Sequence, residues 1–228
     1  MVFHIFFFAS VIAASIGCGL AAVNLYKMLP DKWVCEYGET PGPEYSAENR
    51  CRFGRKGFGV ILLLSALTLM FTALRTDNSS FRSFTGNMLF VSAVLVLLTA
   101  ASLSDTDYMI IPDQICAAVA AAGITANGVS GAFFGAASAG ALMLLGTLAG
   151  KLFSGSESVG MGDLKLLTAC GAVAGSTESG VFLFCVSMLS SALFFAAGML
   201  TGRIKYGDSC PLAPWISVSL IILLLSKL

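Results

Sequence analysis

The chain has 228 residues, of which 57% are hydrophobic and 11% are charged. Because soluble domains carry about 25% charged residues, the solvent for most of this chain must be lipid. Equal numbers of basic and acidic residues, 13 of each, give a formal net charge of zero, which argues against a nucleic-acid-binding protein. The seven cysteines are an odd number, lie mostly in apolar segments and predict no disulfide framework.

Eight apolar runs follow one another along the chain, separated by polar or Gly- and Pro-rich segments. A spanning helix needs about 20 mainly apolar residues, with a range of about 17 to 25. We therefore predict an all-α, polytopic membrane protein with about eight transmembrane helices. The fourth, sixth and eighth runs are short enough to fit half-buried or re-entrant helices equally well. The runs cover residues 3–26, 58–74, 88–103, 114–128, 131–150, 164–175, 180–200 and 214–225.

The basic residues predict the topology, because Lys and Arg are in excess in cytoplasmic loops. The 27–57 loop holds six of them, so we place this loop inside and the N-terminus outside. Alternation over eight helices then leaves ten basic residues inside and three outside, and it puts segments 104–113 and 154–163 on the cytoplasmic face. This result needs a turn at 126–131, where Asn and Gly favour one. The predicted parts are a first transmembrane helix (1–26), a cytoplasmic loop domain (27–57) and a membrane-embedded domain (58–228).

Four acids stand directly against apolar sequence: Asp105, Asp107, Asp113 and Asp163. Ionisable groups at membrane depth are costly and are candidates for function. Asp113 also has a structural explanation, because it follows Pro112 and precedes the fourth run, where it is expected to serve as a helix N-cap. Asp163 alone fits a helix start equally well, but a second acid on the same face favours a functional pair.

A pair of carboxylates can hydrolyse a peptide without a metal or a nucleophilic side chain. Held close together, the two groups cannot both ionise easily, so one keeps its proton near neutral pH. The charged member takes a proton from water, and the protonated member polarises the scissile carbonyl. Other chemistries fit poorly, because His4 is the only histidine, which argues against Ser-His and Cys-His triads and most zinc hydrolase sites.

Both acids lie in recognisable local patterns. Residues 160–163 read Gly-Met-Gly-Asp and are followed by Leu-Lys-Leu, and Asp105 stands seven residues before Pro112 in an Ile-Pro-Asp triplet. These segments resemble the type IV prepilin peptidases, membrane aspartic proteases with a Gly-x-Gly-Asp signature. The resemblance implies Asp105 and Asp163 as the catalytic pair. It implies supporting roles in the catalytic loops for Gly160, Gly162, Lys165, Pro112, Asp113 and Asp107.

Two weaker matches extend this resemblance over most of the chain. Residues 17–30 are similar to the family's Gly-rich opening helix, which ends in Tyr-Arg-Leu-Pro. Residues 210–215 read Cys-Pro-Leu-Ala-Pro-Trp and resemble the Pro-Phe-Gly-Pro segment before the family's last helix. A lone Gly-x-Gly-Asp is weak evidence, but four features in the same order are strong.

The resemblance implies a substrate and a cellular location. The substrate is the N-terminal leader of prepilins or pseudopilins, in type IV pilus or type II secretion systems, cut at the cytoplasmic face of the bacterial inner membrane. Partners are then this substrate and the lipid bilayer, and the sequence does not specify the oligomeric state. Proteolysis by the acid pair needs no cofactor.

Many family members also methylate the new N-terminal amine with S-adenosylmethionine, and their first loop commonly carries two Cys-x-x-Cys pairs suited to zinc. Here Cys35 and Cys51 are each followed, three residues later, by glycine. We therefore expect no structural zinc, and methyltransferase activity stays open.

Three alternatives remain beside the prepilin peptidase. Presenilin-like Gly-x-Gly-Asp proteases carry a Tyr-Asp dipeptide, but no tyrosine directly precedes Asp105 or Asp107. A small ion or proton transporter could use the same acids as relay groups, although such proteins often show internal repeats and none is convincing here. A purely structural membrane component would leave the acid pair unexplained.

Overall fold

The computed structural model describes residues 2–35, 42, 65, 68–69, 81–154, 160–205 and 209–227. Over these ranges the chain is helical and contains no strand, which confirms the all-α prediction. A short 3-10 helix, η1 (Asp31–Trp33), follows the first helix. The α-helices are α1 (Val2–Met28), α3 (Phe81–Tyr108), α4 (Asp113–Ser154), α5 (Met161–Ala174), α6 (Thr177–Leu200) and α7 (Ala213–Lys227).

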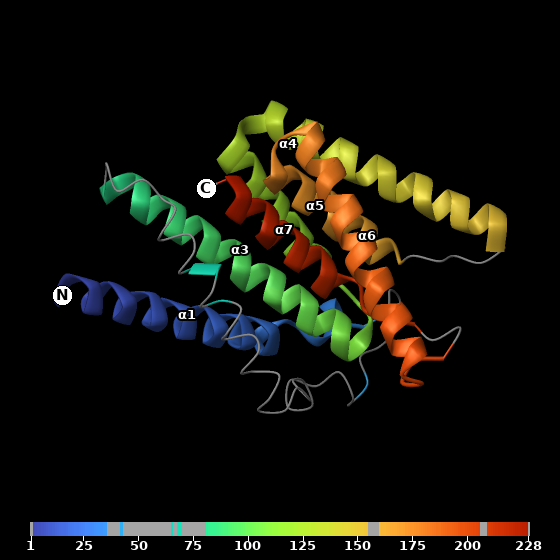
Figure 1. The fold of residues 1–228 in the computed structure, drawn as a ribbon, viewed down its shortest axis with the longest axis horizontal. Helices are drawn as coiled ribbons and strands as arrows, with labels where there is room; N and C mark the ends of the chain where they lie inside the picture. Colours follow the sequence, from blue (N-terminus) through green and yellow to red (C-terminus); the bar gives the residue numbers. More distant parts are fainter. Residues whose placement is uncertain are drawn as a thin grey trace.

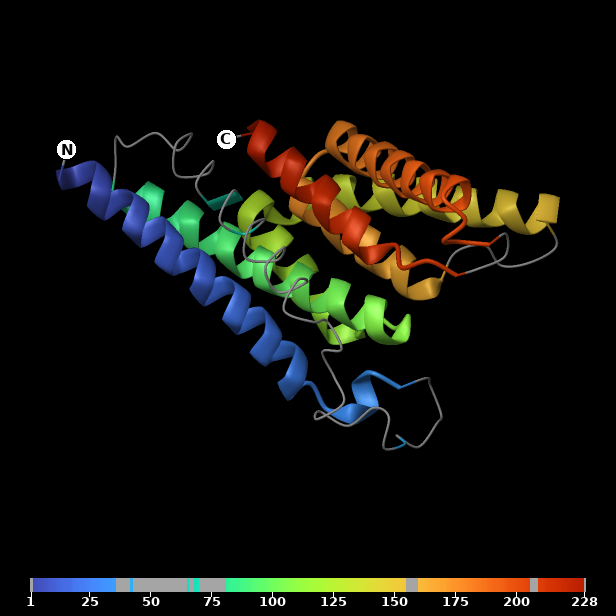
Figure 2. The ribbon, with the colours of Figure 1, turned by 60° about the horizontal axis from the view of Figure 1, so that its bottom comes forward.

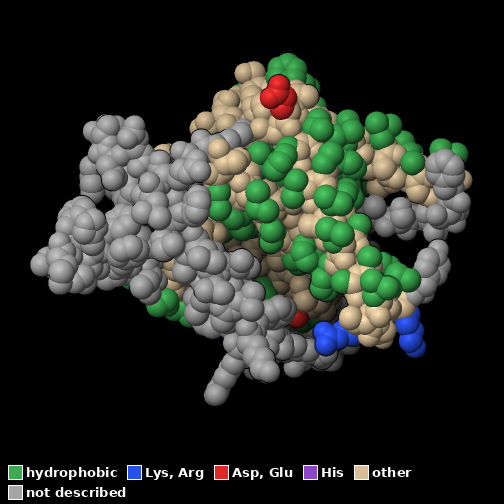
Figure 3. Space-filling model, viewed as in Figure 1, with side chains coloured by type: hydrophobic (Ala, Val, Ile, Leu, Met, Phe, Trp, Pro, Cys, Tyr) green, Lys and Arg blue, Asp and Glu red, His purple; other side chains and the backbone are tan. Residues whose placement is uncertain are grey.

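Three helical stretches in the described part of the chain are long and apolar enough to cross a membrane. They are Gly86–Tyr108, Asp113–Leu152 and Thr177–Leu200, and Ala213–Ser226 is a shorter apolar helix. Hydrophobic side chains spread over the face shown in Figure 3, with Lys and Arg side chains at one end of it. The count of eight helices stays a prediction, because the 58–74 run and the 27–57 loop fall mostly outside the described residues.

Helix α4 reverses its direction at Gly128, whose φ of 68° and ψ of 172° lie in a region that favours glycine. Both halves pack along α5, the first running parallel to it and the second antiparallel. Figure 1 shows the reversal near the top of the view, where α4 turns from green to yellow. The turn predicted between the fourth and fifth runs is thereby confirmed. Neighbouring pairs are Asp113–Lys165 and Gly123–Ala172 before the turn, and Gly135–Gly171 and Gly140–Thr168 after it.

Asn127 ties this turn to the end of α5. Its Nδ2 donates to the backbone oxygens of Ala172 at 3.0 Å and Val173 at 2.8 Å. The last carbonyls of a helix have no intrahelical donor, so the amide satisfies groups that would otherwise be unpaired. Helix α5 then ends at Gly175 with a left-handed φ of 75°.

At the other end of the bundle lie termini of all the α-helices in the described part of the chain. Helices α1, α3 and α6 end there, whereas α4, α5 and α7 begin there; the second half of α4 runs in the same direction as α6, and its end stands apart from the others, as Figures 1 and 2 show from two directions. Helices α3, α5 and α7 share a fully buried apolar core. Its members include Leu98, Leu166, Leu167, Ile216 and Leu220.

Candidate active site

Asp105 lies in the last turn of α3 and is 4% exposed. Its Oδ2 accepts a hydrogen bond of 2.9 Å from the backbone N–H of Ala213, the first residue of α7. The backbone N–H of Leu212 also hydrogen-bonds this carboxyl group. An acid from one helix therefore meets the N-terminus of another, where unpaired N–H groups and the helix dipole favour a negative charge.

The chain after Asp105 forms a tight, strained turn. Met109 has a φ of 56°, a left-handed conformation that costs a non-glycine residue about 1 kcal/mol. Its N–H donates to the backbone oxygen of Asp105 at 2.9 Å, and the hydroxyl of the buried Ser104 donates to the backbone oxygen of Ile110 at 2.6 Å. The turn is thus fixed at both ends, and strain of this kind clusters at functional sites.

Asp163 is the third residue of α5, after the N-cap Gly160. The side chain folds back, so that a Cβ at position 160 would lie 3.3 Å from Oδ2 of Asp163. The other oxygen, Oδ1, is buried and has no hydrogen-bond partner among the described residues. Buried polar atoms are nearly always paired, so an exception calls for an explanation such as a catalytic role.

Gly162 brings the two acidic segments together. A Cβ at this position would lie 3.3 Å from Cβ of Ile111, in the turn that follows Asp105. That distance is shorter than ordinary van der Waals contact, so a larger residue would require Ile111 or the start of α5 to shift by a few tenths of an ångström.

The two acids also interact electrostatically. Asp163 lies outside the three spanning-length stretches, and its pKa is raised from 3.8 to about 7, mainly by burial. The neighbouring Asp105 contributes to this rise, because two like charges disfavour each other, while the backbone N–H of Gly160 opposes it. At neutral pH Asp163 is therefore able to hold a proton, as the protonated member of a carboxylate pair must.

Asp113 and Lys165 form an ion pair at the edge of this site. Lys165 Nζ donates to both carboxylate oxygens of Asp113, at 2.8 and 2.9 Å. The predicted N-cap role of Asp113 is wrong: the carbonyl of Pro112 accepts the first helical bonds, from Ile115 and Cys116. Asp113 is instead the first helical residue, and its carboxylate pairs with Lys165 from α5. Both side chains are about half exposed.

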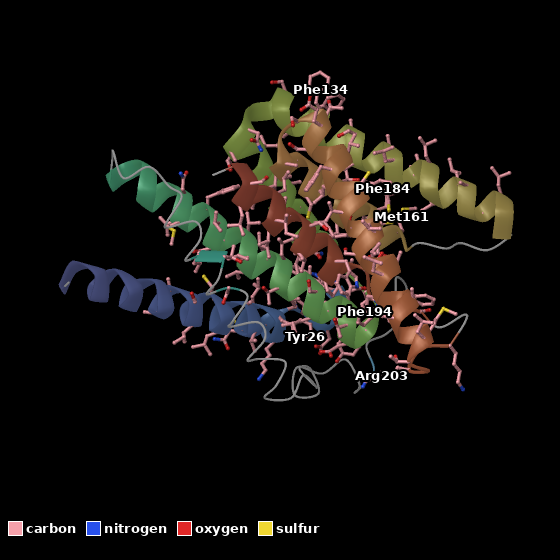
Figure 4. All side chains as sticks on the ribbon, in the orientation of Figure 1. Tyr26, Phe134, Met161, Phe184, Phe194 and Arg203 are labelled. Carbon is pink, nitrogen blue, oxygen red and sulfur yellow. The ribbon has the colours of Figure 1, made fainter. Side chains whose placement is uncertain are left out.

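Asp107 takes part in a separate contact, with α1. Its Oδ2 accepts a hydrogen bond of 2.9 Å from the hydroxyl of Tyr26, a fully buried residue that Figure 4 shows near the end of α3. Asp105 and Asp107 therefore face different partners although they are two residues apart. Cys35 is buried, and its Sγ lies 3.6 Å from the backbone oxygen of Lys32. Its predicted counterpart Cys51 lies outside the described residues.

Sequence reasoning assigned no role to Ala213 or Tyr26, although both lie in segments with a recognised pattern. The signal for Ala213 was the pair of prolines around it, Pro211 and Pro214, because proline is favoured at the start of a helix. For Tyr26 no local signal exists, since its partner is 81 residues away.

Residues 90–196 match the model of the type IV leader peptidase family. The matched segment runs from within α3 to within α6 and includes both Asp105 and Asp163. It includes neither α1 nor α7. No curated protein and no solved structure matches the chain significantly.

Proposed function

We propose, from the match of residues 90–196 to the type IV leader peptidase family, that the chain is a membrane aspartic endopeptidase. Its substrate is the N-terminal leader of type IV prepilins or pseudopilins. One observation carries the proposal. Asp105 and Asp163, from segments far apart in the sequence, interact in one buried site, where Oδ1 of Asp163 has no partner among the described residues.

The reaction follows from the unequal surroundings of the two carboxyl groups. The charged member removes a proton from water, whose oxygen attacks the scissile carbonyl carbon, while the protonated member donates a hydrogen bond to the carbonyl oxygen. The tetrahedral intermediate then breaks its C–N bond, and the leaving nitrogen receives a proton from the pair. Water supplies the oxygen and both protons of the products, so proteolysis uses no cofactor.

The charge distribution supports a site at the cytoplasmic face of the bacterial inner membrane. At the end of the bundle that holds the acids lie six described basic residues, whereas Arg82 and Lys227 belong to helix ends on the opposite side. An excess of Lys and Arg marks the cytoplasmic side. The six are Lys27, Lys32, Lys151, Lys165, Arg203 and Lys205, of which Figure 4 labels Arg203.

Mass spectrometry of a co-expressed prepilin tests the proposal. We expect a product that lacks its leader with the unaltered enzyme, and an intact precursor with Asp105→Asn or Asp163→Asn. Glu178→Gln is the matched control, because this exposed acid lies in the first turn of α6, at the far end of the bundle. An intact precursor beside a folded, unaltered enzyme would exclude the peptidase.

The same spectrum tests a second activity. A methyl group on the first residue of the product would show that the enzyme also transfers one from S-adenosylmethionine. An unmethylated product would limit the function to proteolysis.

A further inference from the structure

The first turn of α7 offers few hydrogen-bond donors, and these are directed at Asp105. The carbonyl of Leu212 accepts the N–H groups of Trp215 and Ile216, at 3.0 and 3.2 Å, so Leu212 is the residue that caps this helix. The N–H of Ala213, like that of any first helical residue, has no carbonyl acceptor within its own helix. Pro214 has no N–H at all. The bond from Ala213 to Asp105 therefore uses the first free donor of the helix.

One helical turn after this bond, a side-chain contact fixes the position of α7 along α3. The hydroxyl of Ser217, one turn after Ala213, donates to the backbone oxygen of Ala213 at 2.8 Å and lies 3.0 Å from the hydroxyl of Ser102 on α3. On the other side, the ring of Trp215 lies 5.0 Å from that of Phe194 on α6, which Figure 4 labels. These contacts leave the start of α7 little freedom to shift along Asp105.

The two carboxyl groups of the site differ in the donors that reach them. Backbone N–H groups of Leu212 and Ala213 point at Asp105, and hydrogen bonds to a carboxylate favour its charged form. One backbone N–H, that of Gly160, reaches the carboxyl group of Asp163, and its Oδ1 meets no donor among the described residues. When one of the pair carries the charge, this asymmetry places it on Asp105.

We propose that Ala213 is a positioning residue of the proposed peptidase: its backbone N–H orients Asp105 and keeps the negative charge on it, so that Asp105 is the general base and Asp163 the acid. This inference rests on the proposed function and assigns the two roles within the pair. It also gives the segment 210–215, which lies outside the family match, a part in the reaction.

Ala213→Pro tests this step, because proline removes the N–H and is tolerated in the first turn of a helix. Loss of one hydrogen bond to a charged group corresponds to a kcat about 10- to 100-fold lower. We expect KM for a prepilin substrate to stay within about twofold, because an interaction made with the general base acts on the transition state rather than on binding.

Two variants separate the lost donor from other effects. Ala213→Val adds as many side-chain carbons as proline but keeps the N–H, so it measures the steric part of the loss. Thr177→Pro places proline at the first residue of α6, at the far end of the bundle, after a residue with the extended backbone that a following proline requires. It should leave kcat unchanged. Equal kcat values for Ala213→Pro and Ala213→Val would overturn the inference and leave the proposed peptidase standing.

A measurement of stability tests the same contact without proteolysis. In detergent, Ala213→Pro should lower the Tm more than Ala213→Val does, and this difference should vanish when both are made in an Asp105→Ala background. A difference that persists without Asp105 would show that the N–H serves another partner, and the inference would fail. If the difference vanishes as expected but the unaltered enzyme leaves the prepilin intact, the proposed function fails, and the assignment of base and acid fails with it.

Discussion

The hydroxyl of Tyr26 donates a hydrogen bond of 2.9 Å to Oδ2 of Asp107 and so joins α1 to the end of α3 beside the candidate active site. Tyr26 is fully buried and lies in the last turn of α1, just before the segment that leads into η1. The contact gives Asp107 a structural partner that Asp105 does not share. The two acids are therefore expected to respond differently to substitution.

Tyr26→Phe removes this hydroxyl and nothing else. A hydrogen bond to a charged group is worth about 1.5 to 3 kcal/mol, so we expect the free energy of unfolding to fall by about that amount, measured by thermal unfolding in detergent. Asp107→Ala removes the acceptor of the same bond, so the double variant should lose less than the sum of the two single losses. Additive losses would show that the two residues act independently.

Asp105→Asn and Asp163→Asn should each lower the rate of leader cleavage at least about 100-fold, because an amide cannot transfer the proton that general acid–base catalysis requires. The protein should still insert and accumulate, since the exchange preserves side-chain size. Asp107→Asn should lower the rate less than tenfold. A larger loss at Asp107 than at Asp105 would mean that the catalytic acid had been assigned to the wrong residue.

The helices and turns around this site could be predicted from the sequence, but the contacts between them could not. The turn at Gly128 and the helices around it follow from apolar runs and from residues that favour turns, which act locally. The bond between Asp105 and Ala213 joins residues 108 positions apart. It depends on how α3 and α7 rotate about their axes, which periodicity cannot fix here, because membrane helices are apolar on the lipid-facing side as well as the buried side.

Asp113 shows a second limit. Its position after Pro112 is a true local signal for a helix start, and α4 does begin there. Whether its carboxylate caps the helix depends on competing partners, and Lys165 arrives from a helix that begins 48 residues later at Met161. Local patterns therefore located the helix start, while tertiary contact decided what the side chain binds.

The raised pKa of Asp163 predicts how stability depends on pH. The folded state holds this proton up to a pH of about 7, whereas the unfolded chain releases it near 3.8. Between these values the folded state binds more protons, so the free energy of unfolding should fall as pH rises from about 4 to about 7. In Asp163→Asn this part of the slope should disappear, as measured by Tm across that range. An unchanged slope would place the titrating group elsewhere.

Activity should depend on the same proton. Because the pair needs one proton to polarise the scissile carbonyl, kcat for leader cleavage should decline as pH rises above about 7. The decline belongs to the coupled pair of Asp105 and Asp163 rather than to either residue alone. A kcat that stays constant from pH 7 to well above it would mean that no such proton is used.

A side chain at position 162 should lower the rate of leader cleavage. In Gly162→Ala the new Cβ would lie 3.3 Å from Cβ of Ile111, so Ile111 or the start of α5 must shift by a few tenths of an ångström. We expect kcat to fall by less than the roughly 100-fold that a misplacement of about 1 Å can cause. Adding Ile111→Ala removes the two next-nearest atoms, at 3.6 and 3.7 Å, and should restore part of the rate. Gly86→Ala is the control, since a Cβ there meets no atom within 4 Å. A Gly162→Ala enzyme as active as this control would show that close approach of the two segments is not required for cleavage.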